Sequence, residues 1–80
     1  MNGDAPLEET FGGKAVGLTF NPSSNEDVNV IKRQCAEAIN LLAGMREAFG
    51  HGEKSRMLSI AITEIQTAQM WAVKAVTWTE

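Results

Sequence analysis

Apolar residues recur every three or four positions along the middle of the chain, which is the period of one face of an α-helix. The first run comprises Val28, Ile31, Cys35, Ala38, Leu42, Met45 and Phe49. A second run follows the break Gly50-His51-Gly52 and comprises Leu58, Ile62, Ile65, Gln69, Ala72 and Val76. Two helices joined by so short a connection fold back on each other. The pattern therefore predicts an all-α fold, an antiparallel two-helix hairpin over residues 23–80.

Polar residues mark the start of the first predicted helix. The Asn21-Pro22 step is unfavourable for helical backbone, because proline restricts the residue before it. Ser23 with Glu26 fits a capping box, and Ser24 with Asp27 offers a second register. The first helix is therefore expected to begin near residue 25.

Glycines and a proline delimit the remaining segments. The first helix is expected to end at about Phe49, since Gly50 suits the left-handed conformation that often follows a last helical turn. The second helix is expected to begin between residues 53 and 56 and to end at about Trp78. Residues 1–22 contain Pro6 and several glycines, and they are predicted to form an irregular N-terminal arm.

Length and composition favour self-assembly. A chain of 80 residues is near the size at which a single core is only marginally stable. The second helix also carries apolar residues outside its stripe: Ile60, Met70, Trp71, Val73 and Trp78. The single cysteine cannot form an intrachain disulfide, and no His and Cys cluster suggests zinc. We therefore expect a homo-oligomer.

The charge balance limits the class of ligand. A net charge of −3 argues against binding a nucleic acid polymer along a basic face, whereas a small anion needs only a few local cations. No segment reaches the ~18 apolar residues of a membrane span, and the acidic N-terminus lacks a signal-peptide pattern. One free cysteine suits a reducing compartment. We expect a cytoplasmic protein that does not enter the membrane.

The residues with nucleophilic or basic side chains have ordinary explanations. Cys35 lies on the first apolar stripe and acts as a small hydrophobe there. His51 lies between two glycines, where no partner is evident that would orient it as a general base. Neither a catalytic set nor a metal or cofactor site is predicted, so we expect a protein that is not an enzyme.

Three cations are candidates for anion binding. Lys32 and Arg33 are adjacent in the first helix, where they form either a solvated face or a phosphate site in which arginine supplies a fork and lysine a point charge. Arg56 lies in the first turn of the second helix, whose free N–H groups attract anions. Glu53 partly compensates that cation.

Three further residues are candidates for binding, and two of them, Phe20 and Thr63, also have a structural interpretation. Phe20 is either a hydrophobic staple on the first helix or a stacking platform for a base. Asn21 beside it offers hydrogen bonds to the same base. Thr63 lies among isoleucines and either bonds its own helix backbone or faces a polar cavity between subunits.

Two segments carry a resemblance to a known family. The segment Gly17-Leu18-Thr19-Phe20-Asn21-Pro22-Ser23 and the helical segment 59–75 resemble the phage helical-hairpin sponges that counter CBASS immunity, a domain shared with anti-Thoeris sponges. The resemblance implies a homohexamer in the host cytoplasm. Such an assembly sequesters cyclic oligonucleotide second messengers without cleaving them.

The resemblance also implies roles for particular residues. In the family an aromatic ahead of the first helix stacks on the bases of a cyclic dinucleotide, and a lysine in that helix meets its phosphate; Phe20 and Lys32 match these roles. Some members hold cyclic trinucleotides in a separate pocket, for which Arg56 and Thr63 are the candidates. Relatives often have tyrosine at the aromatic position, so Phe20 keeps the stacking face but lacks the hydroxyl.

The competing hypothesis is a helical protein-interaction adaptor or phage assembly module, which explains the apolar stripes but not the cations.

Overall fold

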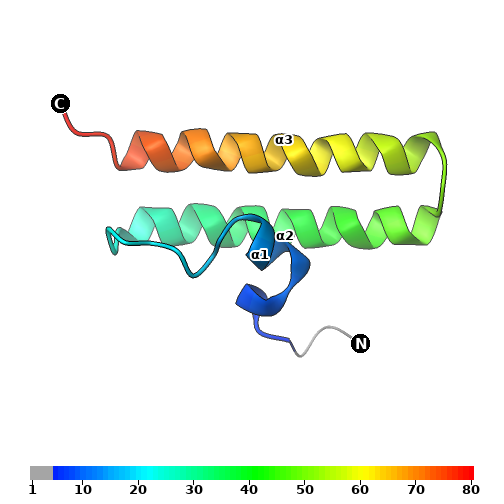
Figure 1. Ribbon diagram of the computed structural model, residues 1–80, viewed down its shortest axis with the longest axis horizontal. Coiled ribbons are helices and arrows are strands. Elements are labelled where there is room, and N and C mark those ends of the chain that lie inside the picture. The colour runs from blue at the N-terminus through cyan, green and yellow to red at the C-terminus, as the bar shows by residue number, and fades with distance from the viewer. Residues whose placement is uncertain (1–4) are drawn as a thin grey trace.

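Two long antiparallel helices form the body of the molecule (Figure 1). The computed structural model describes residues 5–80. Helix α2 (Glu26–Phe49) and helix α3 (Glu53–Val76) lie side by side, joined by the turn at residues 50–52. The shortest dimension is 13 Å, about the diameter of one helix. The all-α hairpin that the periodicity predicts is therefore confirmed, and it forms a single layer.

The start of α2 differs in detail from the predicted capping boxes. Asn25 is the N-cap, and its side-chain oxygen accepts hydrogen bonds from the backbone N–H groups of Asp27 at 2.7 Å and Val28 at 3.3 Å. Ser23 instead donates to the Asn21 side-chain oxygen. Ser24 has a positive φ of 55°. The prediction that Ser23 or Ser24 caps the helix is therefore wrong. The turn after Asn21 places the Asn25 side chain, and not a serine hydroxyl, beside the free N–H groups of the first helical turn.

The other helix ends agree closely with the sequence. α2 ends at Phe49, and Gly50 follows with φ of 76° and donates its N–H to the Arg46 carbonyl. α3 begins at Glu53 and ends at Val76, two residues before the expected end at Trp78.

The predicted irregular arm contains two helical segments. A 3₁₀ turn, η2 (Leu7–Glu9), is followed by the short helix α1 (Phe11–Ala15). Thr10 caps α1 by accepting a hydrogen bond from the Gly13 N–H at 3.1 Å. The expectation of an irregular arm is therefore wrong for these segments, because a threonine cap stabilises a turn that glycine-rich composition disfavours. Residues 1–4 of the arm lie outside the described residues.

Close backbone contacts hold the arm against the hairpin. The Gly12 N–H donates to Asn40 Oδ1 at 2.7 Å, and Asn40 Nδ2 donates to Thr10 Oγ1 at 2.9 Å. Gln66 on α3 donates to the Ala15 carbonyl at 3.3 Å. Gly12 and its neighbour Gly13 are buried. The arm is thus docked on both long helices.

The core lies where the arm meets both helices of the hairpin. Its buried residues are Val16, Leu18, Ala36, Ile39 and Ile62. The predicted stripe of α3 is confirmed, since all its members are buried or half-buried. On α2 the most buried line is shifted to Val28, Lys32, Ala36 and Ile39, because the arm covers a second face of this helix. Met45 and Phe49 at the end of the predicted stripe are exposed.

We expect Gly12→Ala to destabilise the fold by about 3 kcal/mol, the upper end of the usual range for overpacking. An added Cβ would lie 2.1 Å from the Ala36 carbonyl oxygen, which belongs to the backbone. Thermal unfolding followed by circular dichroism measures the effect. Gly44→Ala is the matched control, because a Cβ there meets no described atom within 4 Å beyond the neighbouring backbone of its own helix, and alanine favours the helix by up to about 1 kcal/mol. A Gly12→Ala chain as stable as the parent would contradict the docked arm.

Candidate functional site

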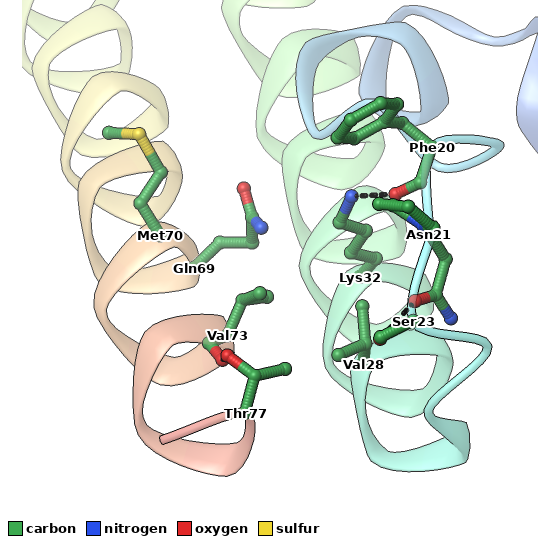
Figure 2. Close-up of a pocket in the computed structure, with 10 residues that line it drawn as sticks. Phe20, Asn21, Ser23, Val28, Lys32, Gln69, Met70, Val73 and Thr77 are labelled. Atoms are coloured by element: carbon green, nitrogen blue, oxygen red, sulfur yellow. Dashed lines mark hydrogen bonds between the residues drawn. The ribbon is translucent and has the colours of Figure 1, made fainter. Parts of the chain in front are cut away.

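A pocket of about 380 Å³ lies between the segment that precedes α2 and the C-terminal half of α3. Phe20, Asn21, Ser23, Val28 and Lys32 line one side of it, and Gln69, Met70, Val73 and Thr77 line the other (Figure 2). The volume is near the lower end of the range for small-molecule sites, roughly 300–1,000 Å³. The pocket therefore brings the predicted stacking residue and the predicted phosphate-binding lysine together.

Lys32 is the central charge of this pocket. Its side chain is only 6% exposed, and its ammonium group donates hydrogen bonds to the carbonyl oxygens of Gly17, at 3.0 Å, and Phe20. The same ammonium nitrogen lies 5.5 Å from the centre of the Phe20 ring, within the range of a cation–π contact. Lys32 thus fixes both the backbone and the ring of Phe20.

The local sequence explains why the chain turns at this place. Gly17 has φ of 63°, a conformation that favours glycine, and its carbonyl accepts the Phe20 N–H at 2.9 Å. Leu18, which lies between Gly17 and Phe20 in sequence, is buried in the core. Asn21 then donates to the Asn25 carbonyl at 2.9 Å and to Asn29 Oδ1 at 3.0 Å. The turn is therefore closed at both ends, and Asn21 has a structural role in addition to lining the pocket.

Two opposing effects act on the Lys32 ammonium. Desolvation by burial lowers the pKa of Lys32 below its usual value. The carbonyl oxygens of Gly17 and Phe20 favour the charged form, because they accept hydrogen bonds from it. An ammonium has three N–H donors, so two go to these carbonyls and a third remains for a ligand oxygen.

The Phe20 ring is available for stacking. Its side chain is 69% exposed, which contradicts the interpretation of Phe20 as a staple buried against the first turns of α2. The ring lines the pocket, and the Lys32 ammonium nitrogen lies 5.5 Å from its centre. An exposed aromatic face beside a buried cation suits a ligand that has both a flat base and an anionic group.

Arg33 does not join Lys32 in this pocket. It is exposed and lines a separate depression together with Glu8, Glu26 and Asn29. Adjacent residues of a helix point in different directions, so the pair that is contiguous in sequence is divided in space.

Arg56 and Thr63 also lie outside the pocket. Arg56 is exposed and forms an ion pair with Glu53, and this hydrogen bond raises the pKa of Arg56 and lowers the pKa of Glu53. Thr63 is exposed, and its carbonyl accepts a hydrogen bond from the Thr67 hydroxyl. Arg56 and Thr63 are seven residues apart on α3, so they share one side of the helix at a separation of roughly 10 Å along its axis.

Cys35 shows no sign of activation as a nucleophile, and the described residues form no metal site. Burial raises the pKa of the Cys35 thiol, which is opposite to the shift of a nucleophilic cysteine. Residues 5–80 contain no group of three or more His, Cys, Asp or Glu side chains placed to hold a metal ion. Within the same range, no helix has the length and apolar character needed to cross a membrane.

Gln69 is a pocket residue that the sequence analysis left in a structural role. It is only 6% exposed and lines the pocket from α3. The sequence marks the position as unusual, because Gln69 is the polar member of an otherwise apolar stripe, but it does not place the residue in a pocket.

We expect Lys32→Met to loosen the turn that carries Phe20, because each hydrogen bond from a charged donor contributes about 1.5–3 kcal/mol. Hydrogen exchange of the Phe20 amide should become at least tenfold faster, measured by NMR on a chain whose helical circular dichroism is unchanged. Arg33→Met is the matched control, since this exposed neighbour donates no hydrogen bond to the turn backbone among the described residues. Equal protection in Lys32→Met and the parent chain would contradict the anchoring role.

A comparison with protein-family models identifies the family of the chain. The sequence model described as "Acb2/Tad1, hairpin domain" matches residues 13–77, which include the Phe20 turn and both long helices. No match was found among curated proteins or among solved structures. Because the matched region covers most of the chain, the protein belongs to the Acb2/Tad1 hairpin-domain family, the family of anti-CBASS and anti-Thoeris sponges.

Proposed function

We propose that this protein is a phage sponge that binds cyclic dinucleotides, and in a second site cyclic trinucleotides, without cleaving them. It acts in the host cytoplasm during infection, where it lowers the concentration of the messenger that activates a CBASS-type effector. The observation that carries the proposal is the buried Lys32 ammonium held beside the exposed ring of Phe20. Family membership supports the same class of ligand.

The pocket separates the two kinds of contact that a cyclic dinucleotide requires. A base stacks on the exposed Phe20 ring, an interaction that contributes about 1–3 kcal/mol per base. A phosphate oxygen accepts the third N–H of Lys32, which is a charge-assisted hydrogen bond in a poorly solvated place. One local cation is sufficient for this, so the net charge of −3 does not oppose the function.

Sequestration fits the side chains of the pocket better than catalysis does. The described residues that line it include no histidine, cysteine, aspartate or glutamate. Its polar groups are amides, hydroxyls and one ammonium, which bind and orient a ligand. We therefore propose that the ligand is released unaltered.

Self-assembly into a hexamer completes the proposal. Trp71 and Trp78 are 68% and 61% exposed, and Met70 at the rim of the pocket is 60% exposed. Exposed apolar side chains of this size are typical of surfaces that another protein covers. A second copy seated on this side of α3 would bury them and extend a pocket that is small for a cyclic dinucleotide.

We expect Phe20→Ala to weaken binding of a cyclic dinucleotide by roughly 5- to 150-fold, which corresponds to the stacking energy of a base. Isothermal titration with a panel of cyclic dinucleotides and trinucleotides measures it. Phe49→Ala is the matched control, because Phe49 is also an exposed phenylalanine near a lysine, with Lys54 at 4.7 Å from its ring centre, but lies outside the pocket.

The panel also separates the proposal from its alternatives. If the parent chain binds no cyclic nucleotide, the sponge function is wrong, and recovery of a stoichiometric protein partner would favour the adaptor. Chromatography of the released ligand tests for catalysis, since an altered ligand would identify an enzyme. Equal affinities of Phe20→Ala and the parent would remove the site assignment.

We expect Arg56→Gln and Thr63→Ala each to weaken the binding of a cyclic trinucleotide, cyclic tri-AMP, by about tenfold. The affinity for cyclic dinucleotides should stay the same. The reason is that these residues share one side of α3, away from the Phe20 pocket. Lys54→Gln is the control for a general loss of positive charge in the same helical turn. A parallel loss of both ligands in Arg56→Gln would contradict a separate site.

A further inference from the structure

The stability of the single chain does not explain why a polar glutamine occupies the nearly buried position 69. Its side chain is 6% exposed, and among residues 5–80 its amide takes part in no hydrogen bond with the protein. Its neighbours on the buried stripe of α3, Ile65 and Ala72, are apolar. No side-chain nitrogen or oxygen of the described residues is both fully buried and unpaired, so in the free chain the Gln69 amide hydrogen-bonds water rather than the protein.

The unpaired amide faces the pocket. Every fully buried side-chain nitrogen or oxygen of the described residues has a hydrogen-bond partner, so the Gln69 amide atoms must reach solvent somewhere. The pocket supplies that opening, because Gln69 lines it. Figure 2 shows the Gln69 side chain extending from α3 toward the side that carries Lys32 and Phe20.

Stacking on Phe20 and phosphate binding by Lys32 do not distinguish one cyclic nucleotide from another. Stacking on Phe20 accepts any base, since every base has an aromatic face. Lys32 recognises phosphate, which all cyclic nucleotides share. A primary amide, by contrast, has one acceptor and one donor group in a fixed arrangement. Base edges differ in this respect: adenine presents a donor beside an acceptor at N6 and N7, whereas guanine presents two acceptors at O6 and N7.

We propose that Gln69 is the specificity-determining residue of this pocket, and that its amide hydrogen-bonds the edge of the base stacked on Phe20. The inference rests on the proposed function, because it requires a nucleotide in the pocket. Binding replaces the water at the amide with a partner on the base. The base whose edge satisfies both amide groups is bound more tightly than one that satisfies only one of them.

Two glutamines on the same helix provide a crossed test. Gln69→Met keeps the length of the side chain and removes the amide, whereas Gln66→Met removes the hydrogen bond to the Ala15 carbonyl and leaves the pocket lining intact. The probes are cyclic di-AMP and cyclic di-GMP, titrated by calorimetry, with thermal unfolding as the second readout.

Gln69→Met is expected to weaken the better of the two probes by about tenfold and to change the ratio of the two affinities by at least about threefold. Its unfolding temperature should equal or exceed that of the parent, since no protein hydrogen bond is lost. Gln66→Met should have a lower unfolding temperature and an unchanged ratio.

The ratio of affinities decides the outcome. If it stays the same in Gln69→Met, including the case in which both probes are lost together, the assignment of specificity to Gln69 is overturned. Should that variant not fold, Gln69→Asn, which withdraws the amide by one methylene, replaces it under the same criterion. A parent chain that binds neither probe overturns this inference, and the proposed function is wrong as well only if no member of the wider panel of cyclic nucleotides binds. Unchanged binding in Gln69→Met overturns the inference alone.

Discussion

The hydrogen bonds from the Lys32 ammonium to the backbone of the Phe20 turn are the interaction on which the site depends. They tie the segment before α2 to the side of that helix and bring an exposed aromatic ring next to a buried charge. Without them the turn at Gly17 would be held by Leu18 and by the Asn21 amide at its other end. One lysine therefore serves the fold through two of its N–H groups and, in the proposed function, the ligand through the third.

This arrangement also depends on the docking of the arm. The backbone at Gly12 approaches α2 so closely that Asn40 accepts its N–H, and Gln66 on α3 holds the end of α1. Val16 and Leu18 then complete a core to which both helices of the hairpin contribute. A hairpin of two helices is one layer thick, and the arm supplies part of the second surface that its apolar faces require. Self-association, as proposed, would cover the exposed tryptophans of α3.

Periodicity was sufficient for the long elements and insufficient for the short ones. The helical hairpin, the end of α2 at Phe49 and the buried stripe of α3 follow from apolar spacing and from one glycine, which are local properties of the sequence. The arm could not be predicted in this way. Its helix of five residues is too short to form alone and exists because Thr10 and Asn40, thirty positions apart in sequence, share a hydrogen bond.

The same distinction applies to the candidate site. Phe20, Asn21 and Lys32 are close in sequence to the start of one helix, and the structure brings all three to one pocket. Arg33 lies elsewhere, because a step of one residue turns the side chain away around the helix. Gln69 reaches the pocket only through the packing of α3 on α2, so its role could not be read from neighbouring residues.

A crystal structure of the protein with a bound cyclic dinucleotide tests the account most directly. We expect a base stacked on Phe20, a phosphate oxygen within hydrogen-bond distance of the Lys32 ammonium, and the ligand between the turn and α3. A ligand bound at another surface, with the Phe20 ring free and Lys32 bonded only to its two carbonyls, would contradict the account.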